Sequence, residues 1–226
     1  MPEMSANAYA ILGLLAARPW SAYELARHMK TSSNLRQIWP RAESKIYQAP
    51  KDLEAAGWAK GRRERNGGRV RTVYRITPKG RRALRKWLDE PSAAPYFELE
   101  VALKVACATA GTIEQLRATL KFGEERRRQR LREFAAGVPE LLDEGFTIPE
   151  RVHTSALVAG LVARIARALG EWHEWAQQAI AGWEDVELDD EKQAWGESVY
   201  KELLAEVDEF LSGVSKSSCV SAYRSE

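Results

Sequence analysis

The chain has 226 residues, of which 45% are apolar and 29% are charged. This composition is typical of a folded soluble protein and excludes a disordered one, and the length allows one large domain or two small ones. No apolar run approaches the roughly 18 residues of a membrane helix, so we expect no membrane partner. The two cysteines, Cys107 and Cys219, lie far apart, which excludes a disulfide scaffold or thiolate zinc site and suits the cytoplasm.

The net charge of +2 conceals a strong asymmetry along the chain. Residues 1–90 carry 19 Lys and Arg against 8 Asp and Glu, whereas residues 91–226 carry 15 against 24. The sign changes at residues 90–96, where two prolines and small residues disfavour helix. We therefore expect a basic domain at 1–90, a linker at 91–97, a second domain at 98–212 and a flexible Ser-rich tail at 213–226. Chance clustering of solvated charges is the alternative explanation of the basic segment.

Short helices are predicted in the basic segment. An apolar stripe with helical spacing forms the first, and Arg18-Pro19 ends it. Ser21 and Glu24 have the spacing of a capping box, which opens a second helix. A third helix is expected from about residue 41 to 56, with Gly57 well placed to end it.

A β-hairpin is predicted next. Two strand-like runs, 58–65 and 69–77, flank Asn66, Gly67 and Gly68, and Asn-Gly is the strongest short hairpin signal. Thr77-Pro78 then opens a fourth helix. Its buried stripe is expected to comprise Ala83, Leu84, Trp87 and Leu88. Three short helices and a hairpin with a basic tip predict a winged helix-turn-helix, whose second motif helix enters the DNA major groove.

The third helix carries the candidate base-reading residues. Its apolar positions are expected to face the core, and the opposite face is polar. These polar residue types can pair with base edges or hold phosphates, although a solvated helix face would also be polar. The candidates on this helix are Arg41, Ser44, Lys45, Tyr47, Gln48 and Lys51.

The hairpin and the fourth helix add a dense basic cluster. Twelve Lys and Arg, but only one acid, Glu64, lie between residues 59 and 86. Like charges at this density repel one another unless a partner such as the phosphate backbone neutralises them. The candidates on the wing are Arg65, Asn66, Gly67, Gly68, Arg69 and Arg71.

Three motifs in residues 5–90 together resemble the PadR family of bacterial transcriptional regulators. They are YAILGLLAARPWSAYELARHM, IWPRAESKIYQAPKDLEAAGWAKGRRE and GGRVRTVYRITPKGRRALRKWL. The resemblance implies a dimeric winged-helix repressor whose C-terminal helices form the dimer. It also implies that Ser44, Lys45 and Tyr47 enter the groove, and that Arg69 and Arg71 lie on the wing.

Pro50 departs from the family pattern, which commonly has leucine at this position. A proline inside a helix removes one backbone hydrogen bond and costs roughly 3 kcal/mol. We therefore expect the third helix either to kink at Pro50 or to begin later, which affects the direction of Gln48 and Lys51.

The second segment is predicted to be all-helical, with helices near 98–110, 112–136, 152–182 and 190–211. The polar run 124–130 is expected to be largely exposed. Long helices with narrow apolar stripes more often pack on a partner chain, so we expect a homodimer. Its predicted interface includes Leu157, Leu161 and Leu203.

Several of the eight tryptophans lie in this segment. With neighbouring acids they could form an effector pocket for a planar or cationic ligand, at Trp172, Trp175 and Trp195. The alternative is that they fill a dimer core.

Catalytic motifs are missing from the sequence. It contains no GxxxxGK, GxGxxG, GxSxG or HExxH, and the three histidines lack ligand spacing. Cys107 lies among small apolar residues and is expected to be a buried structural thiol. We therefore expect no enzyme, cofactor or metal. Two functions remain open: a DNA-binding regulator, or an adaptor that uses the winged helix to dock an acidic protein.

Overall fold

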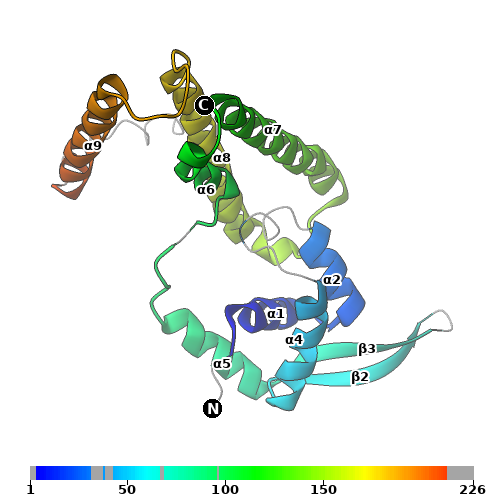
Figure 1. Cartoon of the computed structure of the whole chain (residues 1–226). Coiled ribbons are helices and arrows are strands. Elements are labelled where there is room, and N and C mark those ends of the chain that lie inside the picture. The colour runs from blue at the N-terminus through cyan, green and yellow to red at the C-terminus, as the bar shows by residue number, and fades with distance from the viewer. Residues whose placement is uncertain (1–3, 32–37, 39–42, 67–68, 96, 213–226) are drawn as a thin grey trace, which may run out of the picture.

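The computed structural model describes residues 4–31, 38, 43–66, 69–95 and 97–212. Within these residues the chain forms a mainly helical molecule with one small sheet (Figure 1). The N-terminal half contains α1 (Ala6–Ala17), β1 (Trp20–Ser21), α2 (Ala22–Thr31), α4 (Glu43–Ala55), β2 (Ala59–Asn66), β3 (Arg69–Ile76) and α5 (Pro78–Asp89). The C-terminal half contains α6 (Glu100–Ala106), α7 (Ile113–Glu144), α8 (Val152–Ala179) and α9 (Asp190–Leu211). Short 3-10 turns occupy Ala108–Ala110 and Pro149–Arg151.

The N-terminal half is a winged helix, as the sequence predicts. Strands β2 and β3 pair antiparallel over their whole length, from Ala59 opposite Ile76 to Asn66 opposite Arg69. The predicted turn residues Gly67 and Gly68 lie outside the described residues. The hairpin projects sideways from the helices (Figure 1).

The local helix signals of this half are confirmed. Ser21 and Glu24 form the expected capping box, in which Glu24 N–H donates to Ser21 Oγ (3.2 Å) and Ser21 N–H donates to Glu24 Oε2 (2.8 Å). The Thr77 hydroxyl caps α5 by accepting from Gly80 N–H (3.1 Å). Gly57 follows α4 with a positive φ of 73°, which glycine adopts without strain.

A third strand, β1, was not predicted from the sequence. Trp20 pairs with Tyr74 and Ser21 with Val73, so the sheet order is β1-β3-β2. The indole of Trp20 is 1% exposed, and its Nε1–H donates to the Leu14 carbonyl at 3.0 Å. A strand of two residues has no periodicity to detect, and its existence depends on pairing with a strand more than 50 positions away.

The first hydrophobic core surrounds α1. Ile11, Leu12 and Leu15 are almost fully buried on this helix, where they pack against residues of α2, α4 and the sheet. The buried stripe predicted for the fourth helix, which is α5, is only partly confirmed, because Trp87 is 36% exposed and Leu88 is 66% exposed. The Trp87 ring instead stacks on Tyr9, with ring centroids 4.8 Å apart.

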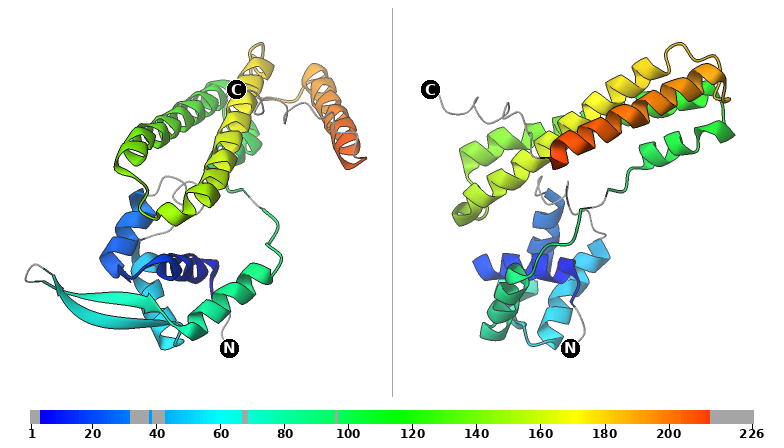
Figure 2. Two further views of the ribbon diagram at one scale, coloured as in Figure 1. Left: turned by 180° about the vertical axis from the view of Figure 1, so that it is seen from behind. Right: turned by 90° about the vertical axis from the view of Figure 1, so that its left-hand side faces the viewer.

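A second, smaller core lies between α7 and α8, at the other end of the molecule (Figure 2). Its buried members are Ile113, Leu116, Leu120, Ala176 and Ile180. Thr112 and Gln115 form the predicted capping box at the start of α7. Helix α7 extends to Glu144, eight residues beyond the predicted end, and contains Pro139 in its last turns.

The polar run of α7 is largely exposed, as predicted, except at Glu124 and Arg127. Glu124 is 7% exposed, and its carboxylate accepts hydrogen bonds from Arg127 (2.6 and 2.7 Å) and Arg128 (2.5 Å). Arg127 also donates to the Ala166 carbonyl of α8 at 2.9 Å. A Cβ at Gly170 would lie only 2.9 Å from Arg127 Nη2, so this glycine leaves the space that the guanidinium occupies.

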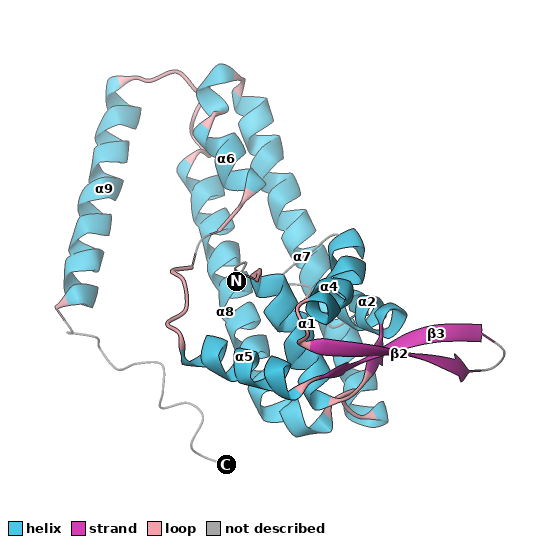
Figure 3. Cartoon of the chain, turned by 90° about the horizontal axis from the view of Figure 1, so that it is seen from below, coloured by secondary structure: helices cyan, strands magenta, loops and turns pink. Residues whose placement is uncertain are grey.

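Helix α9 is set apart from α7 and α8 in the single chain (Figures 1 and 3). Aromatic contacts hold its N-terminal end: Trp195 stacks on Trp175 at 5.9 Å between centroids and meets Trp183 edge-on at 5.5 Å. Farther along α9, Leu203 is 51% exposed and Leu204 63% exposed. The apolar side of α9 is therefore largely uncovered.

One helix meets the length and composition of a membrane span, contrary to the prediction. It comprises Pro149–Ala179, with mean hydropathy 1.3, and 6% of its most apolar window is buried. The prediction considered only uninterrupted apolar runs, and Arg164 and Arg167 interrupt the apolar sequence of this helix. Length and composition alone are weak evidence for a membrane location, because helices that pack in protein interiors meet the same criteria.

The buried Glu124 carboxylate is expected to stabilise the α7–α8 pair. Its hydrogen bond from Arg127 is the largest of the effects that lower its pKa to about 2. Glu124→Ala leaves the Arg127 guanidinium buried without its carboxylate, so the free energy of unfolding should fall by about 3 kcal/mol. Urea denaturation measures this change. The exposed neighbour supplies the control, Glu125→Ala, which should change stability by less than about 0.5 kcal/mol.

Stability is also expected to depend on His28. Burial, together with the charges of Arg18 and Arg151, lowers the pKa of His28 to about 4. The unfolded imidazole binds a proton near pH 6.5, so acidification favours the unfolded chain and stability falls as pH decreases through this window. Between pH 7 and pH 5 this residue should account for a loss of about 2 kcal/mol.

Urea denaturation of His28→Gln at both pH values should show a correspondingly smaller loss. His173, whose pKa burial also lowers, contributes in the same direction and leaves part of the slope in place. The matched control is the exposed histidine variant His153→Gln. Equal pH dependence in His28→Gln and the wild type would show that the folded imidazole is not protected from protonation.

Candidate nucleic-acid interface

Helix α4 separates a buried face from a polar face. Ile46, Ala49 and Leu53 are at most 4% exposed and belong to the first core. The opposite face consists of exposed side chains, Ser44, Lys45, Tyr47, Gln48 and Lys51. Arg41, the remaining candidate of this helix, lies outside the described residues.

Pro50 lies inside a continuous helix that runs from Glu43 to Ala55. Its ring is almost fully buried, so packing in the core offsets part of the cost of the lost backbone hydrogen bond. In the turn before it, the side-chain amide of Asn7 in α1 donates to the Lys45 carbonyl at 3.3 Å. The predicted start of this helix, near residue 41, lies outside the described residues, and α1 holds the first half of the described helix.

The Gln48 side chain has an intrahelical partner. Its Nε2 donates to Asp52 Oδ1 at 2.8 Å, one turn further along α4. A glutamine amide has two hydrogens on Nε2 and an acceptor oxygen, so this bond still leaves groups that could pair with a base edge. Sequence reasoning missed Asp52, although its spacing of four from Gln48 is the helical signal for such a pair.

The end of α4 is attached to the wing. The Glu54 carboxylate accepts a hydrogen bond from Gly61 N–H of β2 at 2.8 Å. A Cβ at Gly61 would lie 2.9 Å from the Thr72 methyl group and 3.1 Å from the Glu54 carboxylate, so a larger residue would require these side chains to shift. This contact sets the position of the hairpin relative to α4.

Only some of the predicted wing residues have side chains within the described part of the chain. Arg65 is exposed near the end of β2. Asn66 and Arg69 occupy strand positions opposite each other, but their side chains, like Gly67 and Gly68, lie outside the described part of the chain. Arg63 is also exposed and shares a strand face with Arg65, because residues two apart point to the same side. It is a further candidate that the sequence analysis did not select.

Arg71 is bound within the protein. Its Nη1 donates to Glu24 Oε1 of α2 at 3.3 Å, and its Nε is buried with no hydrogen-bond partner among the described residues. Partial burial acts to raise the pKa of Glu24, but hydrogen bonds from Ser21 and the charges of Arg71 and Arg18 outweigh it, so the pKa is lowered. Arg71 therefore connects the wing to α2, a pairing over 47 positions that no local pattern signals.

Some cations of the basic cluster bind the carboxyl ends of helices. Lys79 Nζ donates to the Ala56 carbonyl after α4 at 2.9 Å, and Arg81 Nη1 to the Ala16 carbonyl of α1 at 3.4 Å. Cations at these positions interact favourably with the helix dipole. The density of positive charge in residues 59–86 thus has a structural role as well as a capacity to bind a polyanion.

The C-terminal candidates lie on different surfaces. Leu157 is 76% exposed and Leu161 50% exposed on α8. Trp172 packs against the second core and contacts His173 with ring centroids 4.8 Å apart. With Trp175 stacked on Trp195, all three tryptophans of the candidate effector pocket have packing partners within the chain.

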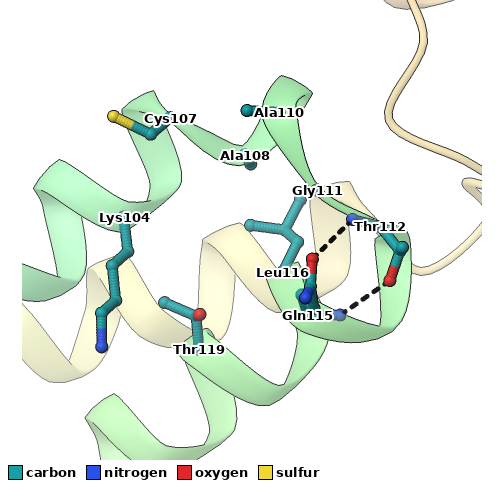
Figure 4. Close-up of a pocket in the computed structure, with 9 residues that line it drawn as sticks. All are labelled: Lys104, Cys107, Ala108, Ala110, Gly111, Thr112, Gln115, Leu116 and Thr119. Atoms are coloured by element: carbon teal, nitrogen blue, oxygen red, sulfur yellow. Dashed lines mark hydrogen bonds between the residues drawn. The ribbon is translucent and has the colours of Figure 1, made fainter.

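A small cavity of about 270 Å³ lies at the corner between α6 and α7 (Figure 4). Lys104, Cys107 and Leu116 are among its lining residues, whereas none of the three candidate tryptophans is. Cys107 is exposed, contrary to the expectation of a buried thiol. It is the C-cap residue of α6, and its neighbours Val105 and Ala108, rather than Cys107 itself, pack against the second core.

Residues 11–86 match the family model described as the transcriptional regulator PadR-like family, which confirms the resemblance of this segment. No curated protein matches the chain at a significant level.

Solved structures share the fold over most of the chain. The crystal structure of Bacillus subtilis PadR in complex with operator DNA is 23% identical and matches with a TM-score of 0.66, over 78% of this chain and 99% of that one. The complex of the same protein with p-coumaric acid is 22% identical, with a TM-score of 0.57 over 76% and 95%. The Vibrio cholerae virulence activator AphA is 21% identical, with a TM-score of 0.54 over 78% and 96%.

Proposed function

Because residues 11–86 place the N-terminal half of the chain in the PadR-like family of transcriptional regulators, we propose that the protein is a sequence-specific DNA-binding regulator. In this proposal it acts in the cytoplasm as a homodimer and represses transcription until an effector releases it from DNA. Residues 1–90 bind DNA, residues 91–97 link the two halves, and residues 98–212 form the dimer.

The exposed polar face of α4, next to a basic hairpin, carries the proposal. Lys45, Tyr47 and Gln48 project from a helix whose other face is fixed in the core, as readout of a major groove requires. The basic residues of the hairpin supply the positive charge that the phosphate backbone needs. The B. subtilis relative in complex with operator DNA supports the same use of the fold.

The contacts of the wing suggest two different roles for its arginines. Arg63, Arg65 and Arg69 hold phosphates, because they lie in the half of the hairpin nearer its tip. Arg71 orients the wing through Glu24 and contributes little to the phosphate contacts. Within α4, Gln48 and Lys45 read bases.

The exposed apolar faces of α8 and α9 support dimerisation. In α8, Gly170 and Ala166 lie against Arg127 of α7, and at 100° per residue Leu161 lies about 180° from Gly170. Leu157 and Leu161 therefore point away from this contact with α7, and both remain exposed. A second copy that covers these leucines and Leu203 of α9 would remove them from water, which favours association.

We also propose an effector site in the C-terminal half. The relative in complex with p-coumaric acid shows that a protein of this fold binds a small planar acid. The tryptophans at 172, 175 and 195 remain our candidates for such a site, and their packing in the single chain means that a ligand must displace one ring or bind at the dimer interface. Fluorescence quenching by a ligand that also weakens DNA binding would support the site.

We expect the wing arginines and Gln48 to give distinct signatures in DNA binding. Arg65→Ala should weaken binding about equally on all duplexes and reduce the slope of log K against log salt by roughly one unit. Gln48→Ala should cost roughly 1–3 kcal/mol on the duplex selected by the wild type and much less on random DNA. Fluorescence anisotropy titrations at several salt concentrations measure both quantities.

Arg71→Ala is the matched control on the same hairpin. Because its guanidinium is bound to Glu24, its removal should leave the salt slope nearly unchanged. If Arg71→Ala instead reduced the slope of log K against log salt by a full unit, Arg71 would have to contact the DNA phosphates. Failure of the wild type to bind any duplex at about 50 mM salt would overturn the proposal and favour the adaptor that docks an acidic protein.

Dimerisation makes a separate prediction at Leu161. A glutamate there would place an unpaired carboxylate in the proposed interface, which costs several kcal/mol, so Leu161→Glu should yield monomers. Light scattering at micromolar concentration distinguishes the two states. Leu188→Glu makes the same change at a leucine that is 75% exposed in the connection between α8 and α9, and should remain dimeric. A monomeric wild type would contradict the dimer itself.

A further inference from the structure

The two halves of the chain meet at the corner between α7 and α8. Arg151, at the end of the 3-10 turn before α8, donates from Nη2 to the Gly13 carbonyl of α1 at 2.5 Å. Three residues earlier, Ile148 packs against the first hydrophobic core. This corner of the C-terminal half therefore packs against the winged helix.

The covalent connection between the halves places little restriction on their orientation. Residues 91–95 and 97–99 are exposed and have no regular secondary structure between α5 and α6. Such a segment acts as a tether that permits many orientations. The angle between the two halves must then depend on noncovalent contacts such as those of Arg151 and Ile148.

Helix α1 connects this corner to α4, the helix that is proposed to read the DNA bases. Gly13 receives Arg151 near the C-terminal end of α1, and Asn7, six positions earlier, donates to the Lys45 carbonyl of α4. Between these positions Ile11 and Leu12 are fully buried, so α1 is held firmly in the first core. A shift of α1 would therefore carry α4 with it.

The chemistry at Gly13 favours a cation. A guanidinium that donates to a backbone carbonyl forms a charge-assisted hydrogen bond, and the Gly13 carbonyl lies just before the last turn of α1, towards the negative end of its dipole. Arg81 occupies a similar place at Ala16, but from within the winged helix itself. Arg151 is the cation that the C-terminal half supplies.

We propose that Arg151 is a positioning residue for DNA recognition, which fixes the angle between the winged helix and the C-terminal helices. The inference rests on the proposed dimer. Two recognition helices held at a fixed separation bind two half-sites at one spacing, whereas loosely tethered ones tolerate several spacings and gain less from the second contact.

The experiment uses the full chain and three duplexes. The first is the two-half-site duplex selected by the wild type from random sequences, the second has five base pairs inserted between the half-sites, and the third contains one half-site. The insertion rotates one half-site by about half a turn of the double helix. The variants are Arg151→Ala and Ile148→Ala, each of which removes one contact of the corner.

The matched control is Arg117→Ala, since Arg117 also donates to a backbone carbonyl, that of Trp183, but both residues belong to the C-terminal half. The wild type and this control should bind the selected duplex at least about tenfold more tightly than the inserted one. Arg151→Ala should reduce this ratio to about two- or threefold by weakening the selected complex. Its affinity for the single half-site should stay within about twofold of the wild type.

An unchanged spacing ratio in both corner variants would overturn the positioning role. Equal losses on all three duplexes would overturn it as well, because they would indicate general damage to the winged helix. Failure of the wild type to bind any duplex would instead reject the proposed function, so the two failures can be distinguished.

Discussion

The burial of α1 is the interaction on which the rest of the structure depends. Ile11, Leu12 and Leu15 fill the space between the other elements of the winged helix and create the core that fixes α4. The polar edges of the same helix hold Lys45 through Asn7 and Arg151 through Gly13. Burial of apolar side chains provides the stability, and the hydrogen bonds at its edges provide direction.

The positive charge of the winged helix serves both the fold and the proposed contacts with DNA. Lys79 and Arg81, although exposed, donate to helix carbonyls, and Arg71 binds Glu24; Arg63 and Arg65 are exposed on the hairpin. A cation that binds a phosphate must first give up any contact that it makes within the protein, which favours Arg63 and Arg65 as phosphate ligands. A count of basic residues therefore overstates the number available to a polyanion.

Prediction from the sequence succeeded where the determining interactions are local. The capping boxes at Ser21 and Thr112 and the N-cap at Thr77 depend on residues within one turn. The same reasoning missed β1 and the burial of Glu124, because these depend on partners that are distant in sequence or on another helix. For the candidate site, the polar face of α4 was predictable from periodicity, whereas the binding of Arg71 to Glu24 was not.

The uncovered C-terminal helices would link the proposed dimer to DNA recognition. In the single chain the leucines of α8 and α9 remain in contact with water, so the C-terminal half buries less apolar surface than a partner would allow. If a second copy covers them, the free energy of DNA binding includes that of association, and affinity depends on protein concentration. The linker alone would then transmit little of the geometry of the dimer to the recognition helices. The contact of Arg151 with α1 supplies a direct route, because it attaches the start of the proposed dimer helix α8 to the helix that holds α4.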